Sequence, residues 1–562
     1  MNLTRWAFSA VILSTSLAWA DVKLPAILSD NMVLQAGKPL AIWGTAEAAE
    51  KVTVTLGQET LTTSADAAGK WQVKFKPLPA GATPKMTVVG NNTLTVSNIL
   101  VGSVWICSGQ SNMEFGMKNA HNAATEIPLA KYPQLRLFMV TKRTALQPQN
   151  DVVGKWVECT PKSILEGGWA GFSAVAYFFG RDFLVAGKQP VGLIQTCWGG
   201  TPAQSWTSFA ALENVPQLKY HVNTPILKEP EKSADIVAGQ YQKVLAAWET
   251  QQEKWQKENK APYDEKLKAW TQAAKLAKEQ GQPEPAKPQP PKAGPKKPLS
   301  ADKSPWTPTA LYNGMIAPLL PYAIEGAIWY QGESNAGQAV EYRTLFPTMI
   351  TDWRQKWGQG DFPFLFVQLA NYHPRDEKPT DPGWAWLREA QTMTLQLPNT
   401  GMAVAIDIGQ SNDIHPRNKS DVGHRLALHA LKMVYGKNVA TSGPLYDAIK
   451  MEGTKIRVSF KELGGGLMIG AAPSTQPSVP PEKPAAALTG FAVAGEDQVW
   501  VWAQAKIEGD QVVVWSDQVA KPVAVRYAWA NNPACNLYNQ AGLPASPFRS
   551  DDWKTAKAAA KP

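Results

Sequence analysis

The run Gly102-Ser103-Val104-Trp105-Ile106-Cys107 is short and apolar, and Ser108-Gly109-Gln110-Ser111-Asn112-Met113 follows it directly. Such a run, ended by a glycine turn, is typical of a buried strand. A serine at a sharp turn where a strand ends can project its hydroxyl into an open site. The sequence therefore predicts that Ser111 is a nucleophile.

Further apolar runs alternate with helical patterns between residues 99 and 440. They are residues 191–197, 326–330, 364–370 and 402–408. Strands separated by helices predict an α/β domain with a parallel sheet covered on both faces. Because ligands of such sheets bind beyond the carboxyl ends of the strands, the residues that follow each run are candidates for a site.

With 562 residues, the chain is too long for one ordinary core, and we expect three or more units. Residues 21–98 carry period-two alternation and predict a small N-terminal β-sandwich domain. Similar patterns over 441–553 predict a C-terminal β domain, followed by a basic tail at 554–562.

An insertion of about 215–305 interrupts the central domain. Residues 241–280 are rich in Ala, Lys, Glu and Gln, and Trp248 and Trp255 lie seven positions apart, which predicts a helical hairpin. The proline-rich stretch 282–298 is expected to be an extended, solvated linker. The insertion is either an arm that touches a polymer or shades the cleft, or a decoration without chemistry.

The first twenty residues have the pattern of a secretory signal. Arg5 precedes an apolar stretch at 8–17, and Ala18-Trp19-Ala20 fits a cleavage site after Ala20. We expect a secreted or periplasmic bacterial protein. No later run is long and apolar enough to insert stably in a membrane.

The composition limits which binding partners, metal sites and disulfides are expected. The net charge of +9 comes from lysines spread over the insertion and the tail, so nucleic acid is not an expected partner. The four cysteines include no C-x-x-C pair, so neither a zinc site nor a disulfide scaffold is expected. Cys107 and Cys197 are expected as buried thiols, and their pairing stays open. The 23 tryptophans either line a sugar-binding cleft or serve packing.

His415 is the preferred general base among six histidines. It follows the apolar run 402–408, Asp413 stands close beside it, and Pro416 stiffens its loop. His373, after the run 364–370, is the competitor. Serine, imidazole and carboxylate together predict acyl transfer by a serine hydrolase. The loops 197–201 and 331–335, with the amide of Ser111, are candidate oxyanion donors.

Four blocks of the sequence resemble the sialate O-acetylesterases, a family of SGNH hydrolases. The blocks are Ser108-Gly109-Gln110-Ser111-Asn112-Met113, Trp198-Gly199-Gly200-Thr201, Trp329-Tyr330-Gln331-Gly332-Glu333-Ser334-Asn335 and Asp413-Ile414-His415-Pro416. Arg388-Glu389-Ala390-Gln391 also resembles this family. The resemblance implies an SGNH-type three-layer αβα catalytic domain over 99–440, with flanking β-sandwich-like domains.

The resemblance also implies roles for single residues. Ser111 would be the nucleophile, His415 the base, and Gly200 or its neighbour Gly199 the backbone oxyanion donor. Gln331 is the favoured side-chain donor, with Asn335 second. The candidate substrate-binding residues are Trp198, Arg388 and Glu333.

The acid of the triad departs from the superfamily pattern. The usual Asp stands three residues before the His, where this chain has Asn412, and Asp413 is two before. His415 would be oriented by Asp413, by a backbone carbonyl, or by another acid such as Glu333 or Asp407.

The implied activity is removal of O-acetyl groups from a carbohydrate, without a metal or an organic cofactor. The expected partner is an acetylated sialic acid or, alternatively, an acetylated plant polysaccharide such as xylan or xyloglucan. Two other readings stay open. A non-catalytic carbohydrate-binding protein would need the β domains but not Ser111, and a lipase would need an apolar acyl pocket.

Overall fold

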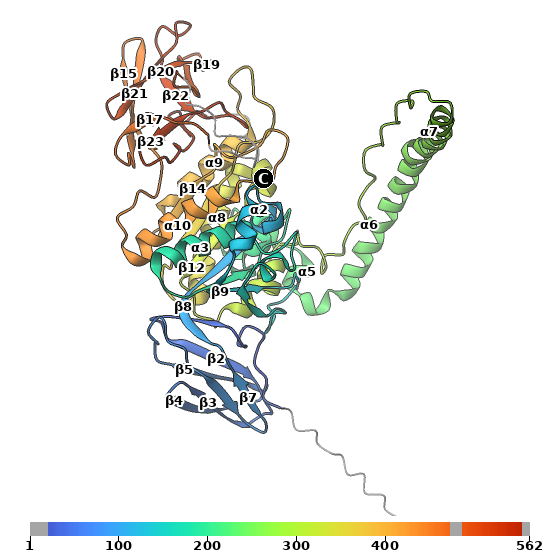
Figure 1. Cartoon of the computed structure of the whole chain (residues 1–562), viewed down its shortest axis with the longest axis vertical. Helices are drawn as coiled ribbons and strands as arrows, with labels where there is room; N and C mark the ends of the chain where they lie inside the picture. Colours follow the sequence, from blue (N-terminus) through green and yellow to red (C-terminus); the bar gives the residue numbers. More distant parts are fainter. Residues whose placement is uncertain (1–20, 473–485, 554–562) are drawn as a thin grey trace, which may run out of the picture.

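The computed structural model describes residues 21–472 and 486–553. The predicted signal sequence at 1–20 and the basic tail at 554–562 lie outside the described residues. Figure 1 shows a central body, a β region at each end of it, and one helical arm that projects sideways.

The core of the central body is an eight-stranded sheet with the order β10-β9-β11-β8-β12-β13-β14, in which β1 also pairs with β8. Its strands are β1 (Val33–Gln35), β8 (Leu100–Gly109), β9 (Tyr132–Met139), β10 (Trp156–Cys159), β11 (Val191–Gln195), β12 (Gly326–Tyr330), β13 (Phe364–Gln368) and β14 (Thr400–Val404). All pairs are parallel except β9 with β10. The predicted α/β class with a largely parallel sheet is confirmed.

Helices cover both faces of this sheet. Trp105 on β8 packs against Phe179 and Phe183 of α3 (Ala174–Gly187), and α10 (Lys419–Tyr435) packs on α3. Trp329 on β12 is aligned with Ser108, three residues along from Trp105, and therefore points to the opposite face.

On that opposite face Trp329 contacts Phe346 and Trp353 of α8 (Ala339–Trp357), and α9 (Gly383–Met393) packs on α8. The shorter helices are α1 (Ser111–Glu114), α2 (Ala123–Glu126), α4 (Phe209–Asn214) and α5 (Pro225–Lys228).

The two terminal regions consist of antiparallel sheets. In the N-terminal region, β2 (Leu40–Thr45) pairs with β5 (Lys70–Phe75). Its other sheet contains β3 (Lys51–Leu56), β4 (Glu59–Ser64), β6 (Met86–Val89) and β7 (Thr93–Val96). The start of β8 pairs with β1. Figure 1 shows β8 leading from this region into the central body.

In its described residues, the C-terminal region contains three small sheets. Their strands are β15 (Leu445–Glu452), β16 (Lys455–Lys461), β17 (Leu467–Ile469), β18 (Phe491–Ala494), β19 (Val501–Trp502), β20 (Gln504–Glu508), β21 (Gln511–Trp515), β22 (Ala524–Tyr527), β23 (Leu537–Asn539) and β24 (Phe548–Arg549). The proline-rich stretch 474–484 of this region lies outside the described residues.

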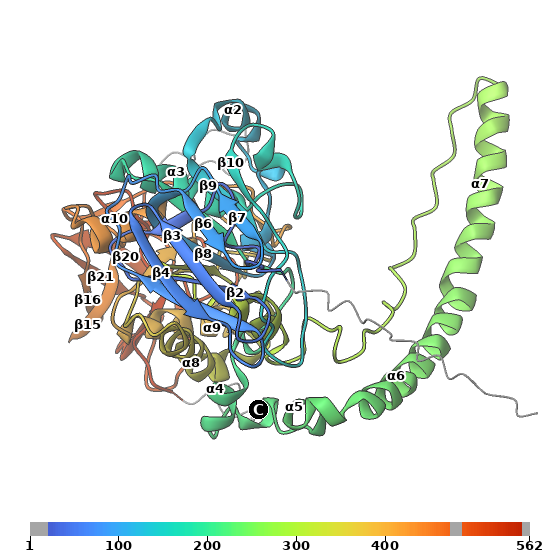
Figure 2. The ribbon, with the colours of Figure 1, turned by 90° about the horizontal axis from the view of Figure 1, so that it is seen from below.

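The insertion differs from the expected helical hairpin. A π-helical turn at Gln256–Lys260 joins α6 (Ala234–Trp255) to α7 (Ala261–Glu279), so the two form one long helical rod. Figure 2 shows this rod extending away from the central body, with the proline-rich segment returning beside it.

Three tryptophans of the rod attach the returning segment. The indole N–H groups of Trp248, Trp255 and Trp270 donate to the carbonyls of Pro295, Lys292 and Pro285, at 2.8, 3.1 and 2.7 Å. A polyproline-type strand makes no hydrogen bonds of its own and leaves its carbonyls free to accept. The stretch expected as a solvated linker is therefore docked on the helices.

Within the described residues, no helix combines the length and apolar character needed to cross a bilayer. All four cysteines are free thiols, and burial raises the pKa of Cys107 and Cys197 above the usual value. Both residues pack in the core as free thiols, and no disulfide joins them.

Arg388 on α9 joins the sheet to the C-terminal region. It is 0% exposed, and its guanidinium donates to the carbonyls of Leu369, Ala370, Ala530 and Asn531. Arg388 was predicted to contact substrate, but its donors are used inside the fold, so we assign it a structural role.

We expect Arg388→Met to destabilise the protein by about 3 kcal/mol or more, because four carbonyls lose a charged donor. Thermal unfolding measures this change. Arg375→Met, which alters an exposed arginine, is the control and should stay within about 0.5 kcal/mol of the parent. Equal stability of the two variants would contradict the structural role.

Candidate active site

Loops from neighbouring strands meet at the carboxyl edge of the sheet. Ser111 follows β8, the loop 196–202 follows β11, and Gln331 follows β12. Gly109, which precedes the nucleophile turn, has a φ of +134°, and a Cβ there would lie 2.2 Å from the carbonyl oxygen of Tyr330. Only glycine permits this backbone approach, so the turn that presents Ser111 depends on it.

Ser111 and His415 are in direct contact although 304 positions separate them. The Nε2 atom of His415 lies 2.9 Å from Oγ of Ser111. A hydrogen bond of this length is the geometry in which an imidazole can take the hydroxyl proton. His373, the competing histidine, packs its ring beside Tyr372 and Trp384 instead.

The carboxylate of Asp413 is near His415 without holding the ring closely. Its Oδ1 atom accepts from the backbone N–H of His415 at 2.9 Å, and Nδ1 of the ring is 3.7 Å from the same oxygen. The rings of Trp169 and His415 pack edge to face, with centroids 4.9 Å apart. Ring orientation therefore depends on packing and on the loop as well as on the carboxylate.

The other candidate acids are engaged elsewhere. Asp407 makes two hydrogen bonds of 2.7 Å with Arg425 and accepts from the hydroxyl of Tyr538. Glu333, in the 3-10 helix η10 (Glu333–Gln338), accepts from Nδ2 of Asn112. Neither carboxylate is hydrogen-bonded to His415 in the described residues.

Burial lowers the pKa of His415 below its usual value, and the nearby Lys419 lowers it further, whereas Asp413 raises it. Desolvation disfavours the imidazolium, and a cation nearby repels it. These effects favour the neutral form of His415, which is the form that accepts a proton.

The loop after β11 lies against the nucleophile. Gly199 donates its N–H to Oε2 of Glu114 at 2.7 Å, and Glu114 also pairs with Lys142. Gly200 has a φ of +73° and is exposed. Within the described residues no hydrogen bond uses the N–H of Gly200 or of Ser111, so both are available to a developing oxyanion.

The side-chain amides predicted as oxyanion donors are engaged behind the site. Gln331, 0% exposed, donates to Oδ1 of Asn335 and accepts from the hydroxyl of Tyr342. Asn335 donates in turn to Gln204 and accepts from the N–H of Ala203. These bonds tie the β12 loop to the β11 loop, which positions the glycine turn.

Aromatic side chains lie next to His415 and next to the glycine loop. Trp198, predicted to bind substrate, is partly buried, with Lys142 5.4 Å from its ring centroid. Trp306, where the chain returns from the arm, is 53% exposed and donates its indole N–H to the carbonyl of Gly200 at 2.7 Å. Trp169 and Trp306 were not singled out from the sequence, because nothing local distinguishes them among 23 tryptophans.

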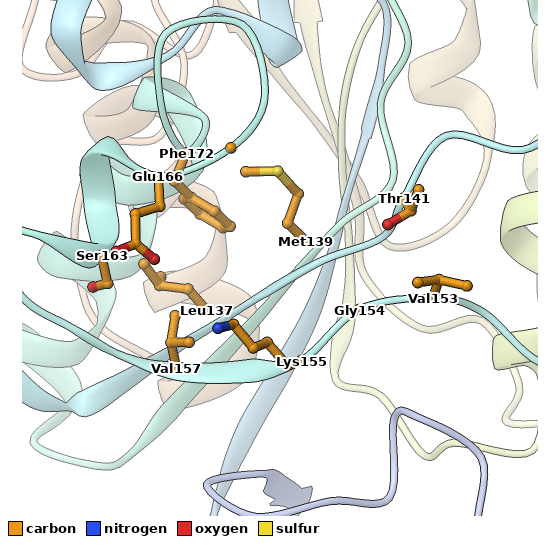
Figure 3. Close-up of a pocket in the computed structure, with 11 residues that line it drawn as sticks. Leu137, Met139, Thr141, Val153, Gly154, Lys155, Val157, Ser163, Glu166 and Phe172 are labelled. Atoms are coloured by element: carbon orange, nitrogen blue, oxygen red, sulfur yellow. The ribbon is translucent and has the colours of Figure 1, made fainter.

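An apolar cavity of about 480 Å³ lies between β9 and the segment that contains Ser163, Glu166 and Phe172 (Figure 3). Leu137, Met139 and Phe172 line it, with Lys155 and Glu166 at its edge. Its lining includes neither Ser111 nor His415, so the cavity is separate from the reacting groups. In the described residues, no group of three or more His, Cys, Asp or Glu side chains could hold a metal ion.

The chain is similar to several known proteins. A family profile described as carbohydrate esterase, sialic acid-specific acetylesterase matches residues 301–432. Rat sialate O-acetylesterase is 31% identical over 462 residues, which cover 75% of this chain and 76% of the relative. The human sialate O-acetylesterase is 30% identical over 476 residues, with 77% and 76% covered.

A solved carbohydrate acetylesterase from Xanthomonas citri is similar over nearly the whole length. It superposes with a TM-score of 0.73 at 34% identity, covering 95% of this chain and all of that one.

The lowered pKa of His415 predicts the acid side of the rate profile. Activity requires the neutral imidazole, so it is lost as the pH falls through the pKa of this residue. We expect the acid limb of kcat/KM for 4-nitrophenyl acetate to have its midpoint below the ordinary histidine value of about 6.5. A midpoint at or above that value would contradict the burial argument.

Glu114 is expected to act through Gly199. Glu114→Ala frees that N–H and loosens the glycine loop, so kcat should fall roughly 10- to 100-fold with little change in KM. Lys142→Met is the matched control, because it removes the cation but leaves the bond from Gly199 to Glu114. Steady-state kinetics that gave the same kcat for both variants would refute this positioning role.

Proposed function

The chain belongs to the sialate O-acetylesterase family, and on that premise we propose that it removes O-acetyl groups from sialic acids. It is a carboxylic ester hydrolase acting on carbohydrate. The single observation that carries the proposed mechanism is the 2.9 Å contact between Nε2 of His415 and Oγ of Ser111.

The proposed reaction has two halves. Oγ of Ser111 attacks the acetyl carbonyl while His415 takes its proton, and the imidazolium then returns the proton to the departing sugar hydroxyl. The N–H groups of Ser111 and Gly200 would stabilise the oxyanion. Water, activated by His415, then attacks the acetyl-serine and releases acetate, which restores both side chains.

Asp413 is the proposed acid partner, acting at longer range than in a tight triad. Its carboxylate fixes the backbone of His415 and stabilises the imidazolium through space across 3.7 Å. A role for Gln331 or Asn335 would be to support the glycine loop rather than to touch the oxyanion.

The proposal includes the organisation of the chain. An SGNH-type three-layer αβα catalytic unit would span 99–440, interrupted by the arm at about 215–305. β-sandwich-like units at 21–98 and 441–553 would flank it. Export, with cleavage after Ala20, rests on the sequence of residues 1–20.

A second candidate substrate is an acetylated polysaccharide such as xylan or xyloglucan. The near full-length similarity to a carbohydrate acetylesterase supports it. So do Trp169, 39% exposed beside His415, and Trp306, 53% exposed beside Gly200, because exposed indole faces can stack on neutral sugar rings.

The deciding experiment measures acetate release from O-acetylated sialic acid, acetylated xylan and acetylated xyloglucan. Ser111→Ala should lower the rate by at least about 10³-fold, and His415→Ala should do so too, since nucleophile and base act as a unit. The matched control is Ser411→Ala, which changes an exposed serine on the same loop as His415.

Full activity of a folded Ser111→Ala protein would reject the mechanism. Sugar binding without ester turnover would favour a binding protein, and comparable rates on acetyl and butyryl esters would favour a lipase.

A further inference from the structure

Asn112 connects the nucleophile turn to the histidine loop. It follows Ser111 directly, is 2% exposed, and donates from Nδ2 to the carbonyl of Ile414 at 3.0 Å. Ile414 directly precedes His415. One hydrogen bond thus joins the neighbours of the two reacting residues across 302 positions of sequence.

Two opposite charges set the direction of the Asn112 amide. Its Oδ1 accepts from Nζ of Lys419 at 2.5 Å, and its Nδ2 also donates to Oε1 of Glu333 at 2.5 Å. A lysine ammonium can only donate and a carboxylate can only accept. The amide therefore has one favourable orientation, in which Nδ2 faces Ile414.

Lys419 is buried beside Asn112, to which it donates. It is 0% exposed, and its Nζ lies 4.8 Å from the ring centroid of Phe115 and 5.2 Å from that of Tyr330. No carboxylate reaches ion-pair distance from it in the described part of the chain. Burial lowers its pKa to about 7, against the attraction of Glu333 and Asp413.

Glu333 has the complementary environment. Within residues 21–472 and 486–553, its Oε2 is buried without a hydrogen bond, and Asn112 is the side chain that donates to its Oε1, next to the backbone N–H groups of Gly332 and Glu333. Burial acts on both side chains: it lowers the pKa of Lys419 and raises the pKa of the partly buried Glu333, so each charged form depends on the polar partner that Asn112 provides.

We propose that Lys419, Asn112 and Glu333 form a positioning relay that sets the distance between Ser111 and His415 through the carbonyl of Ile414. The relay acts on the backbone of the base, which matters because the carboxylate of Asp413 is 3.7 Å from the imidazole. None of the three needs to touch the substrate. The inference rests on the proposed Ser111–His415 mechanism.

The central test is Asn112→Asp. The change keeps the size of the side chain and an acceptor for Lys419, but it replaces the donor Nδ2 by an oxygen that faces Ile414 and Glu333. We expect kcat for 4-nitrophenyl acetate to fall roughly 100-fold, as for a displacement of about 1 Å, with KM within about twofold. A purely structural role would lower the melting temperature and leave kcat per folded molecule unchanged.

A pair of variants at Glu333 provides a rescue. Glu333→Ala removes the acceptor, and we expect kcat to drop by roughly 10-fold or more. Glu333→Gln keeps an oxygen for Asn112 and should recover most of that loss. The pair decides the question independently if Asn112→Asp does not fold.

Lys419→Met adds a pH readout. The charged groups that act on His415 are Lys419 and Asp413, with Glu333 and the Glu114–Lys142 pair on the adjoining elements. Loss of the ammonium removes a repulsion that lowers the pKa of His415, so the acid limb of kcat/KM should move to higher pH. Lys38→Met is the matched control: this partly buried lysine donates to the carbonyl of Ile324, remote from the site, and the limb should stay in place.

The relay is overturned if folded Asn112→Asp keeps kcat within about threefold of the parent, or if Glu333→Ala and Glu333→Gln are equally active. If the acid limb of kcat/KM does not move in Lys419→Met, Lys419 is not part of the relay. Failure of the underlying mechanism is distinguishable, because only that failure leaves Ser111→Ala fully active.

Discussion

The parallel pairing of β8 with β11 and β12 is the constraint on which the rest of the molecule depends. It brings three strand ends to one edge of the sheet. Strand pairing by itself therefore makes the turn of Ser111, the glycine loop and Gln331 neighbours, and no side-chain contact is needed for this. The fit is close at Gly109, where a Cβ would collide with the carbonyl of Tyr330. A displaced β12 would therefore move the nucleophile as well as the support behind it.

His415 reaches the same edge by a different route. It stands between β14 and α10, and the position of α10 is set by its packing on α3 rather than by strand pairing. A loop whose position depends on helix packing alone is fixed less precisely than a loop that follows a hydrogen-bonded strand. The bond from Asn112 to Ile414 supplies the missing constraint, and the loop carboxylate Asp413 reinforces the backbone from its exposed side.

The strand ends and the pairing of Ser111 with His415 were predictable because their signals are local: apolar runs, a glycine turn, and a histidine with a neighbouring aspartate. The orientation of polar side chains was not. Whether Arg388, Gln331 or Asn335 faces substrate or core depends on tertiary packing, and all three form buried bonds. Lys419 begins an amphipathic helix and resembles a surface lysine in sequence. The arm was expected as a hairpin because a tryptophan seam predicts a helical partner, whereas the partner here is a proline-rich strand.

The base of the arm, not its tip, contacts the loop that carries the proposed oxyanion donor. Trp306 donates to the carbonyl of Gly200, while Glu114 accepts from the N–H of the preceding residue, Gly199. The N–H of Gly200 lies between these two fixed groups, so its direction is set before any substrate arrives. Donors that need no reorganisation stabilise a developing charge most effectively. An insertion that leaves the fold between the glycine loop and β12 can thus lengthen or change at its far end while the peptide beside Ser111 keeps its geometry.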